Sequence, residues 1–315
     1  MTPHTRPSRV EILDTTLRDG LQNEGTVLAT DEKIRLARRL ADAGLRQLEV
    51  GSFVNPKKVP QMADTDQVVE GLLDLEDSGV ELFALVFNAR GAQRAADSGI
   101  RRVKLVISAS EGHSRANADA SIPEATDRLL SAVEVLKDND IEFDLGTAVS
   151  FICPFDGITD PDHLISVIQP FVEAGARAIG VADTIGNANP SLVAGTVRRV
   201  QEAFPGYPLN LHLHDTYNFG MANVCAALDL GVSWFDAALG GLGGCPFAPG
   251  AAGNIGTDDL VHLLHREGVS TGVDSEKLAQ IRPQLSAAVG HNLTSSLAEI
   301  PAVPAIDPAG EGADS

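Results

Sequence analysis

The chain has 315 residues and carries 43 acidic against 24 basic side chains, a net charge of −19 at neutral pH. This length fits two average domains or one large α/β barrel. With 43% hydrophobic and 21% charged residues, the composition disfavours global disorder and a coiled coil. The acidic excess repels nucleic acid and anionic lipid, so an anionic ligand must meet a local basic cluster.

Three cysteines are too few and too scattered for a disulfide scaffold, and no CxxC pair is present to hold zinc. No apolar run reaches the roughly 18 residues that a membrane helix needs. We therefore expect an unprocessed cytoplasmic protein with no membrane or nucleic-acid partner, beginning with a short tail over residues 1–8.

A helix-like stretch, a turn residue and a short Val/Ile/Leu-rich run recur along the chain. The turn residues are Gly44, Gly79, Gly99, Asp140, Gly175, Gly206 and Gly231. With the opening strand at 10–14 they give eight strands that alternate with helices, which favours a parallel sheet buried on both faces. The pattern predicts a TIM (β/α)8 barrel over residues 9–274. An open doubly wound sheet is the alternative, weakened because no GxGxxG follows the first strand.

The expected helices of the barrel share amphipathic spacing and, in several cases, a proline near the start. They cover 30–43, 64–77, 89–98, 122–139, 160–174, 190–204, 219–230 and 257–266. After the repeat stops, we expect a short C-terminal helical extension over 275–300, with one or two helices. Residues 301–315 are rich in Pro, Ala, Gly and acid, which is typical of a disordered tail.

Active sites of TIM barrels lie at the carboxyl ends of the strands, which directs attention to the polar residues there. His212 and His214 are two apart on a strand, so both side chains point to the barrel interior. A lone buried histidine is usually structural, but an H-x-H pair beside Asp215 favours a divalent metal site. With carboxylates and no cysteine nearby, Mg²⁺ or Mn²⁺ suits the pair best.

Arg18 and Asp19 directly follow the first strand. They could form an ordinary surface ion pair. Their position favours another interpretation, in which the carboxylate completes a metal's ligand set and the guanidinium holds a carboxylate or enolate oxygen.

Six glycines lie between Gly240 and Asn254, together with Cys245. The segment could be a flexible linker, or a mobile lid that delivers a thiol to the site. Cys245 is then a candidate acid or base. Cys153 and Cys225 are expected to be inert.

The motifs RDGLQNE, SFVNPKKVPQM, ADTIG, HLHDTY and GLGGCPFAPGAAGN occur in this order and resemble those of 3-hydroxy-3-methylglutaryl-CoA (HMG-CoA) lyases over about residues 9–274. The resemblance implies a TIM barrel that cleaves HMG-CoA to acetyl-CoA and acetoacetate. It implies metal ligation by Asp19, His212, His214 and Asn254, enolate stabilisation by Arg18, and proton transfer among Asp19, His212 and Cys245. Further polar positions implied on the substrate side are Gln22, Asn23, Glu49, Ser52 and Asp183.

Some positions depart from this resemblance. The first strand reads LDTTLRDG, as in related synthases, Gly25 replaces a common lysine, and VGS precedes Phe53. A lyase for a longer or differently branched 3-hydroxyacyl-CoA is therefore an alternative. An isopropylmalate or homocitrate synthase-like condensing enzyme, a hydroxy-oxo-acid aldolase and a non-catalytic ligand-binding barrel are others. The short chain after the barrel disfavours the synthases.

The implied acyl-CoA substrate is polyanionic, so it needs the local basic cluster that the acidic composition demands. Lys57 and Lys58 follow the second strand and are predicted to contact the substrate, with Arg115 as a further candidate. They could equally be solvated loop cations. A homodimer is a possible assembly.

Overall fold

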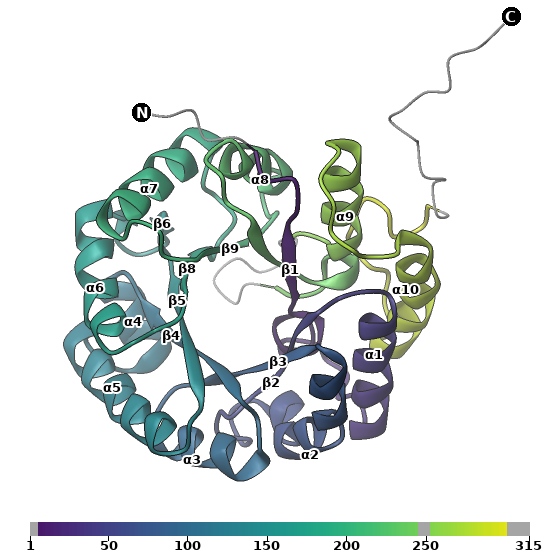
Figure 1. The fold of residues 1–315 in the computed structure, drawn as a ribbon, viewed down its shortest axis with the longest axis horizontal. Coiled ribbons are helices and arrows are strands. Elements are labelled where there is room, and N and C mark those ends of the chain that lie inside the picture. The colour runs from purple at the N-terminus through teal and green to yellow at the C-terminus, as the bar shows by residue number, and fades with distance from the viewer. Residues whose placement is uncertain (1–5, 245–252, 301–315) are drawn as a thin grey trace, which may run out of the picture.

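Eight parallel strands close into a barrel in the computed structural model, which describes residues 6–244 and 253–300 (Figure 1). Around the barrel the order is β1-β10-β9-β8-β5-β4-β3-β2. The predicted TIM barrel is confirmed. Its strands are β1 (Glu11–Asp14), β2 (Gln47–Ser52), β3 (Glu81–Val86), β4 (Arg102–Ser108), β5 (Glu142–Ala148), β8 (Ile179–Asp183), β9 (Leu209–Leu213) and β10 (Trp234–Ala237). A short antiparallel pair, β6 (Ile152–Cys153) and β7 (Gly157–Ile158), lies outside it.

Helices surround the barrel as an outer ring (Figure 1). They are α1 (Thr30–Asp42), α2 (Thr65–Glu70), α3 (Ala89–Ser98), α4 (Glu111–Ala118), α5 (Ile122–Asp138), α6 (Pro161–Glu173), α7 (Pro190–Ala203), α8 (Gly220–Leu228), α9 (Thr257–Arg266) and α10 (Ser275–Val289). Prolines stand in the first turn of α5, α6 and α7, where no amide donor is needed. No helix in the described part of the chain is long and apolar enough to cross a membrane.

Two expectations about helices were wrong in detail. The stretch 64–77 is not continuous: α2 ends at Glu70, and a separate 3-10 turn covers Leu73–Ser78. Gly71 lies where they part, so close to α1 that a Cβ would meet Ile34 at 2.4 Å. The short helix α4 was not expected at all, although Ser110 caps it by accepting the amide of His113.

The hydrophobic core lies mainly between the barrel and its helices, whereas the barrel interior is largely polar. A separate small apolar cluster, Leu13, Phe83, Ala178 and Trp234, lies inside the barrel. Buried inward-facing Lys104, Asp144 and Asp236 accompany it. Charged groups buried this deeply require hydrogen-bonding or oppositely charged partners. The bonds that these three residues make connect the barrel interior to both of its ends.

The C-terminal extension is one helix followed by an irregular segment. The helix α10 lies beside α1 and α9 (Figure 1). Beyond it, the amides of Thr294 and Ser295 both donate to the carbonyl oxygen of Gly240, at 2.8 and 2.9 Å. The extension therefore supports the first residues of the glycine-rich segment.

Candidate active site

The turn after β1 positions two of the expected site residues. Thr16–Gly20 forms a single π-helical turn, in which the amide of Gly20 donates to the carbonyl of Thr15. Such turns are uncommon and occur often at functional sites. Here the turn brings Arg18 and Asp19 over the carboxyl end of the barrel.

The end of β9 positions the two histidines and Asn254. The residues 253–255 pair with this strand: the amide of Asp215 donates to Gly253, and the amide of Ile255 donates to Leu213. A bridge then sets Asn254 directly opposite His214. This pairing brings residues 40 positions apart in the chain into one site.

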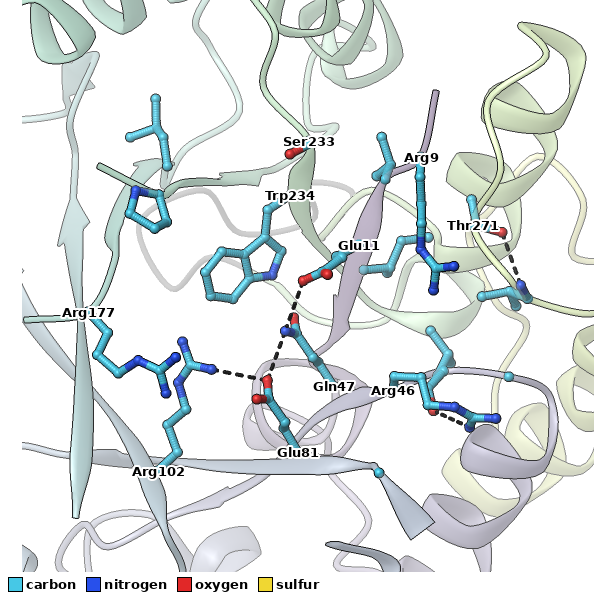
Figure 2. Close-up of a pocket in the computed structure, with 18 residues that line it drawn as sticks. Arg9, Glu11, Arg46, Gln47, Glu81, Arg102, Arg177, Ser233, Trp234 and Thr271 are labelled. Carbon is cyan, nitrogen blue, oxygen red and sulfur yellow. Dashed lines mark hydrogen bonds and ion pairs between the residues drawn. The ribbon is translucent and has the colours of Figure 1, made fainter. Parts of the chain in front are cut away.

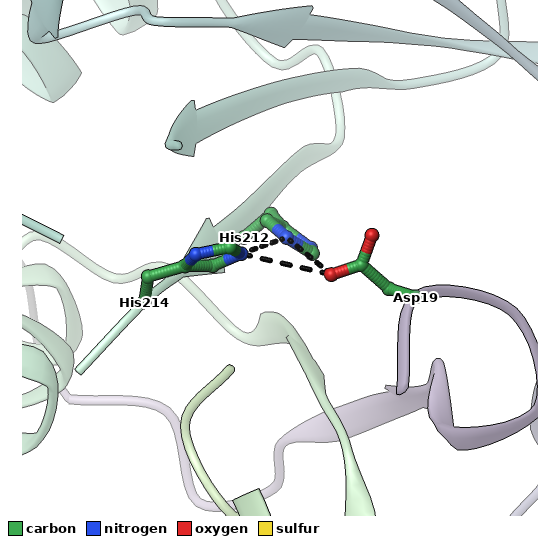
Figure 3. A group of neighbouring side chains, drawn as sticks. All are labelled: Asp19, His212 and His214. Carbon is green, nitrogen blue, oxygen red and sulfur yellow. Dashed lines mark hydrogen bonds and ion pairs between the residues drawn. The ribbon is translucent and has the colours of Figure 1, made fainter. Parts of the chain in front are cut away.

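Asp19, His212 and His214 converge on one point (Figure 3). The Nε2 atoms of the two imidazoles are 3.1 Å apart. Asp19 Oδ2 lies 3.8 Å from Nε2 of His212 and 3.7 Å from Nε2 of His214. One oxygen and two nitrogen donors that face each other this closely fit a shared cation.

The protonation and hydrogen bonding of these residues also fit a metal. Burial opposes ionisation of Asp19, but the charge of Arg18 and the hydrogen bond from His214 outweigh it and hold the pKa of Asp19 well below its ordinary value. Burial lowers the pKa of His214 and favours the neutral form that binds metals. The Asn254 amide nitrogen donates to Asp19 and Leu242, whereas its buried Oδ1 has no partner among residues 6–244 and 253–300. That oxygen is available as a fourth ligand.

A buried charge network orients His212 from behind. Its Nδ1 lies 3.1 Å from Oδ2 of Asp236, which also accepts from Lys104 Nζ at 2.8 Å. Asn210 donates to the other oxygen of Asp236 at 2.8 Å. Burial alone would raise the pKa of Asp236, but the charge of Lys104 and the hydrogen bond with His212 hold it low. An ionised Asp236 fixes the imidazole with Nε2 toward the cavity.

Arg18 is held by two carboxylates. Its Nε donates to Glu49 Oε2 at 2.5 Å, and its Nη1 pairs with Asp19. Glu49 is completely buried and holds the guanidinium in place, and its contact with substrate stays a prediction. Burial disfavours the charged form of Arg18, but Asp19 and Glu49 outweigh it and raise its pKa, which keeps one positive charge at the site.

A cavity of about 220 Å³ opens beside these groups. Arg18, Asp19, Gln22, His212 and His214 line it, as expected, and so does Asn23, whose amide donates to Gly244 O.

The structure places two other expected substrate contacts away from this cavity. Asp183 is buried and accepts the amides of Asn187 and Ala188, and burial raises its pKa to about 6. Ser52 is buried and pairs through its backbone with Thr65. Both have clear structural roles, and their contact with substrate stays a prediction.

The predicted basic cluster lies beside the site, on the neighbouring part of the rim. Lys57 and Lys58 are exposed, and Lys57 lines a groove with Arg90 and Arg94 at the start of α3. Arg94 is already paired with Asp66, and Arg115 is paired with Glu111. Among the described residues, Lys57 and Arg90 therefore supply the unpaired charge of this groove.

Cys245 lies outside the described residues, so its role stays a prediction. Gly243 and Gly253, at the two ends of the glycine-rich segment, are in contact: a Cβ on Gly253 would lie 2.0 Å from the carbonyl oxygen of Gly243. Only glycine permits this approach, which keeps Asn254 next to Asp19. Cys153 is buried and free, with Ser110 Oγ 2.9 Å from its sulfur.

Several residues near the site were missed from the sequence. Lys104 and Asp236 lie inside strands that otherwise look apolar, and a charge at an inward position of such a strand is itself a signal. His113 lines the cavity from α4, where Ser108 contacts its Nδ1 at 2.7 Å. Its segment, SASEGHS, follows a strand end and had that signal, too.

Comparison with known proteins agrees with this geometry. The HMGL-like family model matches residues 9–284. The chain is 42% identical to an (R)-citramalyl-CoA lyase of Chloroflexus aurantiacus, over 90% of this chain and 92% of that one. It is 39% identical to a hydroxymethylglutaryl-CoA lyase of Pseudomonas mevalonii, over 89% and 93%.

Among solved structures, an HMG-CoA lyase from Acinetobacter baumannii, in complex with coenzyme A and 3-methylmalate, superposes with a TM-score of 0.89 at 36% identity. The match covers 96% of this chain and 98% of that one. A family model that spans most of the barrel, relatives of nearly equal length and a shared fold all point the same way. The chain therefore belongs to the HMGL-like family of carbon–carbon lyases.

Proposed function

We propose that this enzyme releases acetyl-CoA from a 3-hydroxyacyl-CoA whose tertiary alcohol carbon also carries a carboxylate-bearing branch, with HMG-CoA as the first candidate substrate. The observation that carries the proposal is the convergence of Asp19, His212 and His214 on one point, next to a guanidinium that faces the same cavity. Cleavage of this kind needs a deprotonated alcohol and a stabilised enolate. The metal-binding residues would provide the first, and Arg18 would provide the second.

A divalent cation, Mg²⁺ or Mn²⁺, held by Asp19, His212, His214 and Asn254, would act as a Lewis acid that makes the substrate hydroxyl more acidic. Arg18 lines the same cavity, where its charge would stabilise the oxygen that becomes negative as the carbon–carbon bond breaks, and Glu49 fixes its orientation. Asp19 is a poor proton acceptor because its pKa is held low. Cys245 is the candidate that returns a proton to the enolate carbon. His212 could exchange a proton only at Nε2 and only while that atom is not bound to the cation, since Asp236 holds its Nδ1.

A second candidate substrate is citramalyl-CoA, whose acyl chain is one methylene shorter between the alcohol and the carboxylate. The 42% identity to a citramalyl-CoA lyase supports it. So does the relative crystallised with 3-methylmalate, a hydroxy diacid with the same four-carbon backbone. The same cleavage would yield acetyl-CoA and pyruvate, whereas HMG-CoA yields acetyl-CoA and acetoacetate.

Exposed cations beside the site are proposed to bind the phosphates of coenzyme A. Lys57, Lys58 and Arg90 supply positive charge on the rim of an otherwise acidic molecule. The glycine at position 25 adds no charge and leaves open space around it.

The decisive experiment incubates the purified enzyme with each thioester and Mg²⁺ or Mn²⁺, and measures acetyl-CoA together with acetoacetate or pyruvate. We expect metal-dependent turnover of one thioester by the wild type and by His163→Ala, an exposed histidine on α6 that serves as the control. Full activity after exhaustive chelation would refute the proposal. Consumption of acetyl-CoA with a 2-oxo acid, without cleavage of either thioester, would favour the condensing enzyme instead.

A further inference from the structure

A second cavity, of about 510 Å³, lies at the opposite end of the barrel from the metal-binding residues. It is formed where the strands begin, by residues just before or at the start of β1, β2, β3, β4, β8, β9 and β10 (Figure 2). We call it the basal cavity and define it by Arg9, Glu11, Arg46, Gln47, Glu81, Arg102, Arg177 and Trp234. None of these residues takes part in the proposed reaction.

The floor of the basal cavity is a connected polar network (Figure 2). Gln47 Nε2 donates to Glu11 at 3.3 Å and to Glu81 at 3.0 Å. Arg102 donates to Glu81 at 3.0 Å and to both oxygens of Asp144 at 3.0 and 3.1 Å. Its guanidinium carbon lies 5.6 Å from the ring centre of Trp234. The floor is therefore built from groups held in fixed positions.

This network is incomplete. Gln47 Oε1, Arg102 Nε and Trp234 Nε1 are buried and have no hydrogen-bond partner in the part of the chain that the structure describes. Buried polar atoms are nearly always satisfied, and an unsatisfied one costs about 1–3 kcal/mol. A purely structural plug at the base of a barrel would pair these atoms and fill the space. Here the side chains that carry these two donors and one acceptor line an open cavity, although the atoms themselves have no exposed surface.

The side chains that line the basal cavity carry four positive charges, on Arg9, Arg46, Arg102 and Arg177, against two negative charges, on Glu11 and Glu81, and this local balance favours an anion. Arg9, Arg46, Arg177 and the two carboxylates are exposed, whereas Gln47, Arg102 and Trp234 are buried. Arg177 pairs with Glu142, but within the described residues neither Arg9 nor Arg46 has a carboxylate partner. Arg46 donates only to the carbonyls of Ala41 and Leu45. In a chain with a net charge of −19, unpaired guanidinium groups beside a hollow form a local attraction for anions.

The rest of the lining favours an organic ligand over inorganic phosphate. Carbon-rich side chains of Val10, Ile12, Leu45, Pro208 and Val273 share the wall with the arginines. A planar carboxylate matches the forked geometry of a guanidinium, while a short carbon skeleton suits the apolar wall. We propose that the basal cavity binds a small organic carboxylate, held by Arg9 and Arg46 and resting on Trp234 and Arg102.

The test uses the natural fluorescence of the enzyme. The chain has one tryptophan, Trp234, and it lies in the basal cavity, so its emission reports on this end of the barrel. Succinate is titrated into the wild type, with inorganic phosphate and with sodium chloride at matched ionic strength in parallel. We expect succinate to change the emission of Trp234 saturably, with the site saturated by about 10 mM succinate, as for a dissociation constant near 1 mM or tighter.

Two charge-removing variants locate the site. In Arg9→Gln/Arg46→Gln we expect the affinity for succinate to fall by about tenfold or more, because both unpaired charges are gone. Arg128→Gln/Arg198→Gln, with two exposed arginines on α5 and α7 that belong to neither site, should bind succinate as the wild type does. Arg9→Gln alone is the safer companion, since the Arg9 side chain makes no hydrogen bond within the described residues. Circular dichroism confirms that each variant is folded.

The possible outcomes separate cleanly. A saturable response that is lost in the arginine variants and kept in His212→Ala supports the proposal. A response that is lost in His212→Ala but kept in the arginine variants belongs to the active site and refutes it. So does a response to phosphate but not to succinate, or one that chloride reproduces. Because no step depends on catalysis, failure here would leave the proposed lyase activity untouched.

Discussion

Buried polar groups at the two ends of the barrel are partnered in different ways. At the carboxyl end, Asp19 and two imidazoles face each other around a shared point, and Asn254 Oδ1 has no partner among the described residues. At the amino end, Arg102 binds the buried Asp144 and the partly exposed Glu81. The same strands therefore carry one end whose carboxylate and imidazoles fit a bound cation and another whose buried carboxylate is paired within the protein. Variants at the two ends should fail in different ways.

The largest effect is expected at the carboxyl end, on catalysis rather than on folding. His212→Ala removes one ligand and the contact with Asp236, so we expect kcat to fall by about 1,000-fold or more. The melting temperature of the metal-free protein should change little, because His212 lies at the cavity wall. His163→Ala is the matched control. A variant that keeps more than a tenth of the activity would remove His212 from the chemistry.

At the amino end the expected loss is in stability. Arg102→Met leaves the buried Asp144 without its partner, and breaking a buried ion pair costs about 3–5 kcal/mol. Urea unfolding measures the difference. The surface variant Arg199→Met, which breaks exposed pairs with Asp162 and Glu202, should cost less than about 1 kcal/mol. Equal losses in the two variants would contradict the structural role given to the amino end.

How far the sequence predicts this molecule depends on whether a feature is local. The eight strands and most helix limits follow from turn residues such as Gly79 and Gly99, which take left-handed backbone angles of φ 83° and 82°. The H-x-H pair and the residues after β1 follow from the same periodicity. Glycine, proline and alternation are read over a few residues, so these features are visible without a structure.

Features that arise from distant contacts were not visible. The pairing of His212 with Asp236 and of Asp236 with Lys104 joins three strands, and no local pattern specifies it. The same is true of the contact between Glu49 and Arg18, which joins residues 31 positions apart in the chain. The basal cavity likewise combines residues from seven strand starts. All of these contacts depend on how the strands are aligned around the closed barrel, and no local sequence pattern specifies this register.

Asp14, a buried acid at the carboxyl end, allows the difference between the two ends to be tested through the pH dependence of stability. Asp14 accepts bonds from Thr16 and Thr257 but has no basic partner within the described residues, and burial raises its pKa from 3.8 to about 6. The folded chain thus holds this proton more tightly than the unfolded chain. The stability that results is present below about pH 4 and is lost as the pH rises through 6, by up to about 3 kcal/mol.

Asp14→Asn removes this titration while keeping the shape of the side chain. We expect the unfolding free energy of the variant, relative to the wild type, to rise between pH 4 and pH 7. Asp74→Asn on the surface should show no such rise, because Arg38 lowers the pKa of Asp74 instead. A difference between Asp14→Asn and the wild type that stays constant over this range would show that Asp14 is ionised throughout.

A smaller effect is expected from Asp236, which orients the predicted metal ligand His212. Asp236→Asn keeps the size of the side chain but weakens the orientation of His212, and such changes typically cost about 10–100-fold in metal affinity. Calorimetric titration with Mn²⁺ measures this without a turnover assay. Asp144→Asn, which lies in the same barrel interior but bonds to Arg102, should leave the affinity for Mn²⁺ nearly unchanged. Equal losses would mean that the two ends are not separable.

The smallest effect is expected from the exposed lysines on the rim of the barrel, which belong neither to the metal-binding residues nor to the basal cavity. Lys57→Glu/Lys58→Glu reverses two exposed charges beside the groove lined by Arg90, so the thioester should bind less tightly while the chemical step is unaffected. We expect KM to rise by about three- to tenfold with kcat nearly constant, since exposed pairs contribute well under about 1 kcal/mol each. Lys137→Glu, exposed on the far helix α5, is the control. The rise should shrink at high salt, because screening weakens exposed charges first. A fall in kcat instead would place these lysines in the reaction, and no change in either constant would make them ordinary solvated cations.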